Sequence, residues 1–197
     1  MADSLFTPAA RRHIALFVRE LEPHATRIDR RLKTLLRQQG LDPEQERAFR
    51  SILPLAAAPV GRFAGQVRYH GRRLAKLNVA LDQAAELLRQ FDAMAGEALD
   101  GRFAPAREQL LLATLHSLHE AYYEVRESEA QAFFGIYRAE TEAADLDDLL
   151  RRFVGVLTRT FHARAGRLVL AESAAPTPVY IERGSADERL IADPAMR

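Results

Sequence analysis

The sequence has no cysteine and no tryptophan among its 197 residues. Without cysteine the chain can form no disulfide, no thiolate metal site and no cysteine nucleophile, which suits a reducing compartment. No apolar run approaches the roughly 20 residues that a membrane-spanning helix needs. The first residues, Met1 to Pro8, also lack the basic-then-apolar pattern of a signal peptide. We therefore expect a cytoplasmic protein with no membrane partner.

A charge excess of either sign is also missing. The chain has 28 Lys and Arg against 27 Asp and Glu, a net charge of +1, so it has no overall attraction to nucleic acid. Arginine pairs such as Arg30-Arg31 and Arg151-Arg152 alternate with acidic residues and lack aromatic stacking partners. Neither a phosphate-binding glycine loop nor a Gly-x-Ser-x-Gly elbow occurs. We expect neither a nucleic-acid partner nor an enzyme within these residues.

Apolar side chains recur at helical spacing along most of the chain, so the predicted fold class is mainly α. Thr7 and Asp42 are suitable N-caps, each followed by a proline at the first helical position. Gly40 is a suitable C-terminal stop. These signals predict a series of helices over residues 8–21, 24–39, 43–53, 59–78 and 81–99.

The run from Pro105 to about Glu142 has no Gly or Pro except Gly135 and exceeds the average helix of about 11–12 residues. Five large apolar residues in it alternate by four and three, which is a heptad seam: Leu111, Leu115, Leu118, Tyr122 and Val125. The helix is either a core helix alone, or a core helix that also pairs with a second copy. We favour the second, because the helix outlasts its domain. A homodimer through this helix and residues 81–99 is predicted.

The composition turns small and polar around Thr141 to Ala144, which places a domain boundary between residues 1–143 and 144–197. Asp145 caps a further predicted helix. The first strand signal is Arg167–Ala171, and Val179–Ile181 is a second. The stretch Gly184–Arg197 is polar and resembles an unfinished domain, so the second part is predicted to be a partial α/β segment.

His116 and His119 lie one helical turn apart beside Glu120, a spacing that metal sites use. A metal needs further ligands, and no pattern in the sequence marks them. We therefore expect a polar helical pair here, and no metal.

Two stretches resemble the sensor globins of bacterial signalling proteins, the globin-coupled sensors. These are Leu21–Asp29, with its Glu-Pro-His and Ile-Asp, and Gly71–Val79, with its Gly-Arg-Arg-Leu start. The resemblance implies a globin-like helical bundle over about residues 6–140. It also places Leu74 at the iron-ligand position and Leu32 near the position of the oxygen-binding tyrosine. Leucine cannot ligate iron, so the resemblance implies a haem-free apolar pocket lined by both leucines, open to a small apolar ligand.

Haem remains possible through His70, which lies one turn before Leu74 on the same helix face and could ligate iron if the helix slid by a turn. A haem-based gas sensor is therefore the first alternative. The other reading of His70 is a hydrogen-bonded surface histidine.

A second resemblance, to the opening of a GAF domain, covers Asp145–Leu150 and Phe161–Leu170. Only the first helix, loop and strands of such a domain are present. The order of globin-like sensor, long helix and GAF resembles the input region of a bacterial sensor histidine kinase. It implies a sensory input and dimerisation module of a two-component system that signals through the long helix to downstream GAF and kinase domains. A protein-interaction scaffold with no small ligand is the second alternative.

Overall fold

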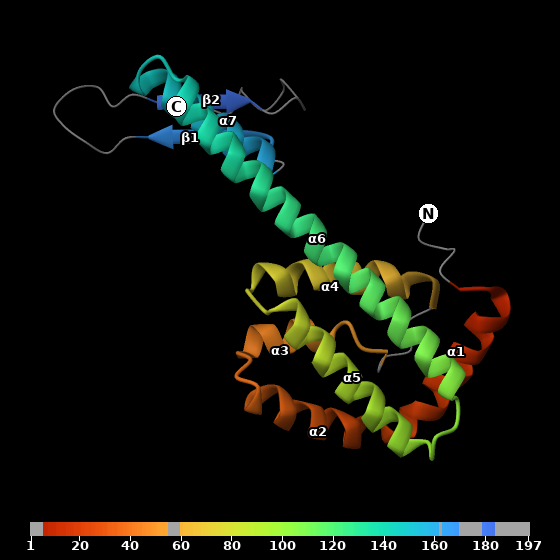
Figure 1. The fold of residues 1–197 in the computed structure, drawn as a ribbon. Helices are drawn as coiled ribbons and strands as arrows, with labels where there is room; N and C mark the ends of the chain where they lie inside the picture. The colour runs from red at the N-terminus through yellow and green to blue at the C-terminus, as the bar shows by residue number, and fades with distance from the viewer. Residues whose placement is uncertain (1–5, 55–59, 162, 170–178, 184–197) are drawn as a thin grey trace, which may run out of the picture. The chain divides into compact units, whose positions relative to one another are not determined.

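The chain is mainly α-helical, as the apolar spacing predicts. The computed structural model describes residues 6–54, 60–161, 163–169 and 179–183 (Figure 1). The predicted helix start at Pro59 and the polar stretch Gly184–Arg197 lie outside this range. Among the described residues, no helix combines the length and the apolar character that crossing a membrane requires.

Packing divides the chain into two compact units, residues 1–125 and 126–197. The division falls inside one long helix, α6 (Ala104–Glu142), and so lies earlier than the boundary at 143/144 that composition suggests. Nothing in the sequence interrupts the helix at this point. Each unit is described by itself below.

The first unit is a bundle of helices, several of which begin or end at the predicted capping and stop residues. Its elements besides α6 are α1 (Pro8–Leu21), η2 (Glu22–His24), α2 (Ala25–Gln38), α3 (Pro43–Arg50), α4 (Val60–Lys76) and α5 (Leu81–Ala98). The Thr7 hydroxyl accepts from the Ala10 N–H, and Asp42 accepts from the Glu44 and Gln45 N–H groups. Gly40 takes the left-handed conformation, φ 75°, that ends α2.

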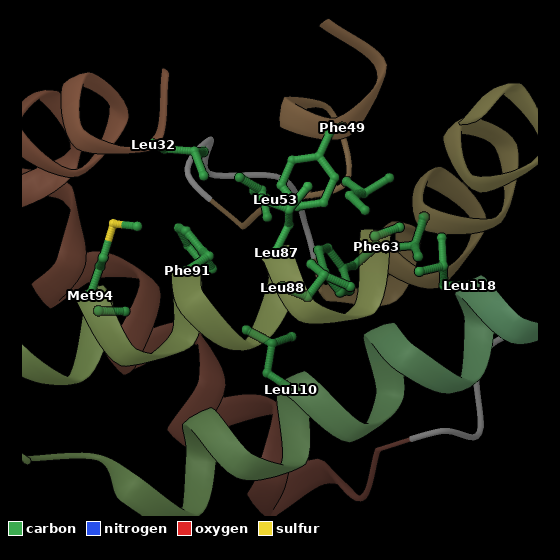
Figure 2. Close-up of a cluster of buried hydrophobic side chains, with 14 of the residues drawn as sticks. Leu32, Phe49, Leu53, Phe63, Leu87, Leu88, Phe91, Met94, Leu110 and Leu118 are labelled. Carbon is green, nitrogen blue, oxygen red and sulfur yellow. The ribbon is translucent and has the colours of Figure 1, made fainter. Parts of the chain in front are cut away.

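The apolar core of this unit collects around α5 (Figure 2). Leu87, Leu88 and Phe91 of α5 are at most 5% exposed. They pack among buried side chains of the surrounding helices, including Leu32, Phe49, Leu110 and Leu118. Helix α5 contacts α2, and α4 contacts α1 and α3. A core of this kind contributes roughly 1.5–3 kcal/mol for each large apolar side chain that it buries.

The second unit comprises the last part of α6, α7 (Leu146–Thr160), β1 (Ala165–Val169) and β2 (Val179–Arg183). The strands pair antiparallel, with Ala165 opposite Arg183 and Val169 opposite Val179, and α7 contacts both strands. Asp145 caps α7, as predicted, because its carboxylate accepts from the Asp148 N–H. The first strand begins two residues before the predicted Arg167. The predicted residues 170 and 171 lie outside the described range.

Candidate functional site

The two leucines expected to line an apolar pocket are fully enclosed. Leu32 of α2 and Leu74 of α4 are both 0% exposed. A side chain with no exposed surface is covered by protein atoms on all sides, so no water-sized space borders either leucine. In this structure the two side chains fill part of the core, and their expected role as the lining of a ligand pocket stays a prediction.

His70, the alternative iron ligand, lies half-buried on α4. Its Nδ1 atom is buried and has no hydrogen-bond partner, and its ring meets the Tyr69 ring edge-on at 4.9 Å between centroids. Burial, together with the positive charge of Arg73, lowers the pKa of His70 below its usual 6.5. A neutral imidazole with a free nitrogen is the form that binds metals.

The small core cavity of the first unit is not lined by His70 and is too small for a haem group. A cofactor of that size needs a cavity on the order of several hundred Å³. The core cavity between α1, α5 and α6 has a volume of about 20 Å³, bordered by Phe17, Phe91 and Leu110. This is room for about one water molecule. A cavity of this volume holds neither a porphyrin nor an apolar ligand of comparable size.

Helix α4 lies directly on α6, and Gly71 makes this approach possible. A Cβ atom at Gly71 would stand 3.0 Å from the Ala121 Cβ and 3.1 Å from the Leu118 Cδ1. Two ion pairs flank the contact, Arg68 with Glu120 at 2.9 Å and Arg72 with Glu124 at 3.1 Å. The apolar spacing over residues 59–78 carries no signal for this role of Gly71, so sequence reasoning missed it.

The start of α6 is also fixed to α5. Arg107 donates to the carboxylate of Asp92 at 2.6 Å and to its backbone carbonyl at 3.0 Å, and both side chains are largely buried. Farther along, the Tyr122 hydroxyl donates to the Val79 carbonyl at 3.0 Å in the core. A charge-assisted hydrogen bond such as that between Arg107 and the Asp92 carboxylate is about twice as strong as a neutral one. The first half of α6 is therefore an integral part of the first unit.

The predicted dimer seam faces this core. Leu118, Tyr122 and Val125 are at most 6% exposed, and the half-buried Leu111 and Leu115 pack against the same cluster. In this structure the seam side chains are buried within their own chain, and their expected use as a dimer interface stays a prediction. Over Leu81–Ala98, the second predicted dimer helix, no large apolar side chain is exposed.

The side of α6 that does face solvent carries large rings. Four aromatic side chains on it are 57–69% exposed and form what we call the aromatic row: Tyr123, Phe133, Phe134 and Tyr137. At 100° per residue these positions fall within about 100° of arc on the helix. Phe133 and Phe134 touch edge-on, at 6.0 Å between centroids. Exposed apolar surface gathered in this way marks an interaction site more often than scattered residues do.

No third potential ligand joins the histidine pair in the part of the chain that the structure describes. His116 approaches Glu120 at 3.5 Å, and no group of three or more His, Asp or Glu converges among the described residues. Glu120 is already paired with Arg68.

Comparison with family models, with curated proteins and with solved structures gives no match to this chain. The functional argument therefore rests on the residues and their geometry.

Proposed function

We propose that this chain is a sensory input and dimerisation module of a cytoplasmic bacterial signalling protein, with α6 as the element that carries the signal. The resemblances in the sequence suggest a two-component sensor histidine kinase as the parent, with a globin-like first unit and a GAF-like second one. The single observation that carries the proposal is the membership of α6 in both compact units.

Helix α6 is built into each unit by close contacts. In the first unit Leu118 and Tyr122 are core residues, and Gly71 brings α4 against the same stretch. In the second unit Ala139 is buried, and Gly135 lies against Val156 of α7. A helix held at both ends by packing transmits a rearrangement of one core to the other, because close-packed interiors do not deform continuously.

The signal enters as a difference in affinity. A ligand or partner that binds one arrangement of the first unit more tightly shifts the population toward that arrangement, by no more than that difference allows. The filled core around Leu32 and Leu74 favours a partner protein or a small apolar molecule that opens the bundle, and disfavours haem.

The aromatic row supplies the dimer contact in place of the buried seam. Tyr123, Ala130 and Tyr137 are seven residues apart, all exposed, and Phe133 lies between the last two. A seven-residue repeat keeps side chains facing a partner helix along its whole length. The second copy would therefore meet α6 on the exposed side chains of the aromatic row.

Disulfide trapping tests the dimer sharply, because the chain contains no cysteine and each introduced thiol is unique. Ala130→Cys is expected to form a symmetric disulfide under mild oxidation. The matched control Gln131→Cys, exposed but about 100° away around the helix, is expected to form much less.

Sedimentation velocity then reports the assembly state. Phe133→Glu combined with Tyr137→Glu should yield a monomer, whereas Phe161→Glu, at the similarly exposed residue that caps the end of α7, should leave the dimer intact. A monomer at all concentrations in the unmodified chain, with equal crosslinking at 130 and 131, would remove the dimer from the proposal.

A further inference from the structure

A groove in the second unit runs between the end of α6 and one side of α7, with a volume of about 400 Å³. Its base is made of small or branched residues, among them Gly135, Ala139, Gly155 and Val156. A Cβ at Gly135 would lie 3.1 Å from the Val156 Cγ1, so the helices are in close contact beneath it. The volume is within the range typical of small-molecule sites, about 300–1,000 Å³.

The groove concentrates positive charge in a chain that is otherwise balanced. Its charged residues are four arginines and one glutamate: Arg138, Arg151, Arg152, Arg159 and Glu142. The formal charge of this lining is +3, compared with +1 for all 197 residues. Guanidinium groups are weakly hydrated and present paired N–H donors that match the oxygens of a phosphate.

Two of the four arginines form ion pairs with carboxylates of the described residues, and two do not. Glu142 accepts from Arg138 Nε at 3.2 Å and from Arg152 Nη1 at 3.1 Å, and Arg152 also reaches Asp148 at 2.9 Å. Within the described part of the chain, Arg151 and Arg159 form no ion pair, although the charge of Arg151 helps to lower the pKa of the nearby Asp148 carboxyl. These two are eight residues apart on α7, about 12 Å along the helix axis.

We propose that this groove is a binding site for a small anion that carries at least two phosphate groups. A single phosphate would contact only one of the two guanidiniums that form no ion pair, Arg151 or Arg159, whereas a chain of phosphates can engage one and extend toward the other. Glu142 then acts as an internal competitor that holds Arg138 and Arg152 until the ligand displaces it. The inference concerns the second unit alone and holds whether or not the chain dimerises.

Titration calorimetry of the full 197-residue chain with sodium tripolyphosphate tests the site, at an ionic strength held constant. Tripolyphosphate should bind at least about tenfold more tightly than orthophosphate, because it makes more charge-assisted hydrogen bonds. Arg151→Gln with Arg159→Gln should weaken tripolyphosphate binding by about tenfold or more. The control Arg126→Gln with Arg164→Gln removes the same charge from exposed positions of the same unit outside the groove, and should change affinity less than about twofold.

A second variant makes a prediction of opposite sign. Glu142→Gln removes the competitor and should tighten tripolyphosphate binding by up to about fivefold, the worth of an exposed ion pair. Equal weakening by the groove pair and the control pair would mean that only overall charge matters, and would overturn the site. Unchanged tripolyphosphate affinity together with a changed sedimentation coefficient in the groove pair would overturn it too, in favour of a protein contact.

Discussion

Among single residues, the two glycines in the middle of α4 have opposite surroundings. A Cβ at Gly65 would meet nothing within 4 Å, whereas one at Gly71 would press on the Ala121 Cβ of α6. The Ala121 methyl is fixed to its own helix and cannot rotate away, so the two helices would have to part. One glycine is a weak point of a helix, and the other is a requirement of packing.

The same substitution at these two positions should therefore change stability in opposite directions. Gly65→Ala should raise the free energy of unfolding by about 0.5–1 kcal/mol, since alanine restricts the unfolded chain and favours helix. Gly71→Ala should lower it by about 1 kcal/mol through overpacking. Urea denaturation followed by circular dichroism measures both. Equal gains at the two sites would contradict the contact described between α4 and α6.

Asp29 is the carboxylate that joins α2 to α3. It accepts from Arg50 at 2.6 Å and from Lys33 at 2.9 Å. Its partial burial opposes ionisation, yet the hydrogen bond from Lys33 and the charge of Arg50 together hold the pKa of Asp29 below its usual 3.8. In the folded chain this group therefore releases its proton more readily than in the unfolded chain.

The sign of the resulting pH dependence follows from linkage. Near and below pH 3.8 the unfolded chain binds more protons at this position, so the stabilisation by Asp29 is complete above that pH and is lost as pH falls through the lower folded pKa. Asp29→Asn should destabilise the chain by about 1 kcal/mol at pH 7, and the difference should shrink in acid. Unfolding measured from pH 2.5 to 7 checks this, and a difference that stays constant over that range would contradict it.

Among the helices and strands, local sequence rules predicted the ends well. Thr7, Gly40, Asp42 and Asp145 each satisfy or end a helix as their side chains and conformations suggest. These positions are predictable because capping involves atoms only two or three residues apart. The strand start was off by two residues, since pairing with a partner far along the chain decides it.

The capping of α7 gives a test at this scale. Asp145→Ala should cost about 1 kcal/mol of stability in the second unit, because the Asp148 N–H loses its acceptor. Asp145→Asn is the matched control, since asparagine caps equally well, and should retain most of that stability. Hydrogen exchange of the α7 amides distinguishes the two variants. Similar loss of protection in both would show that the cap has little effect on α7.

Local sequence rules could not predict which side of α6 faces the core of its own chain. Exposed apolar residues lie directly beside the predicted seam. Leu112 follows the seam residue Leu111, and Tyr123 follows the seam residue Tyr122, so the two sets differ in register by one residue. Both sides of the helix carry large apolar residues, so periodicity alone cannot tell which side the chain itself covers. Packing of α4 and α5 on one side decided it. The arginine groove was equally invisible, because it needs α6 and α7 together.

At the level of the whole molecule, the shared helix α6 predicts that a change in the core of the first unit alters the proposed dimer contact. Leu88 is 2% exposed and borders the small core cavity. Leu88→Ala should enlarge that cavity and change the rate of disulfide formation at Ala130→Cys by about threefold or more. The control Leu16→Ala, 41% exposed on α1, should leave the rate unchanged. An unchanged rate in a destabilised Leu88→Ala chain would show that α6 does not couple the two units.

Because α6 runs for 39 residues without interruption, its length sets both how far apart its two ends lie and in which direction its later side chains point. Each residue inserted between the two units turns everything beyond it by about 100°, whereas seven residues return it to within about 20° of its first heading. Lengthening the helix by seven residues would leave the rings of a lengthened row pointing the same way, while a change of two would aim Phe133 and Tyr137 elsewhere. Insertions or deletions in this helix therefore keep the direction of the aromatic row only when they add or remove close to a whole number of helical turns.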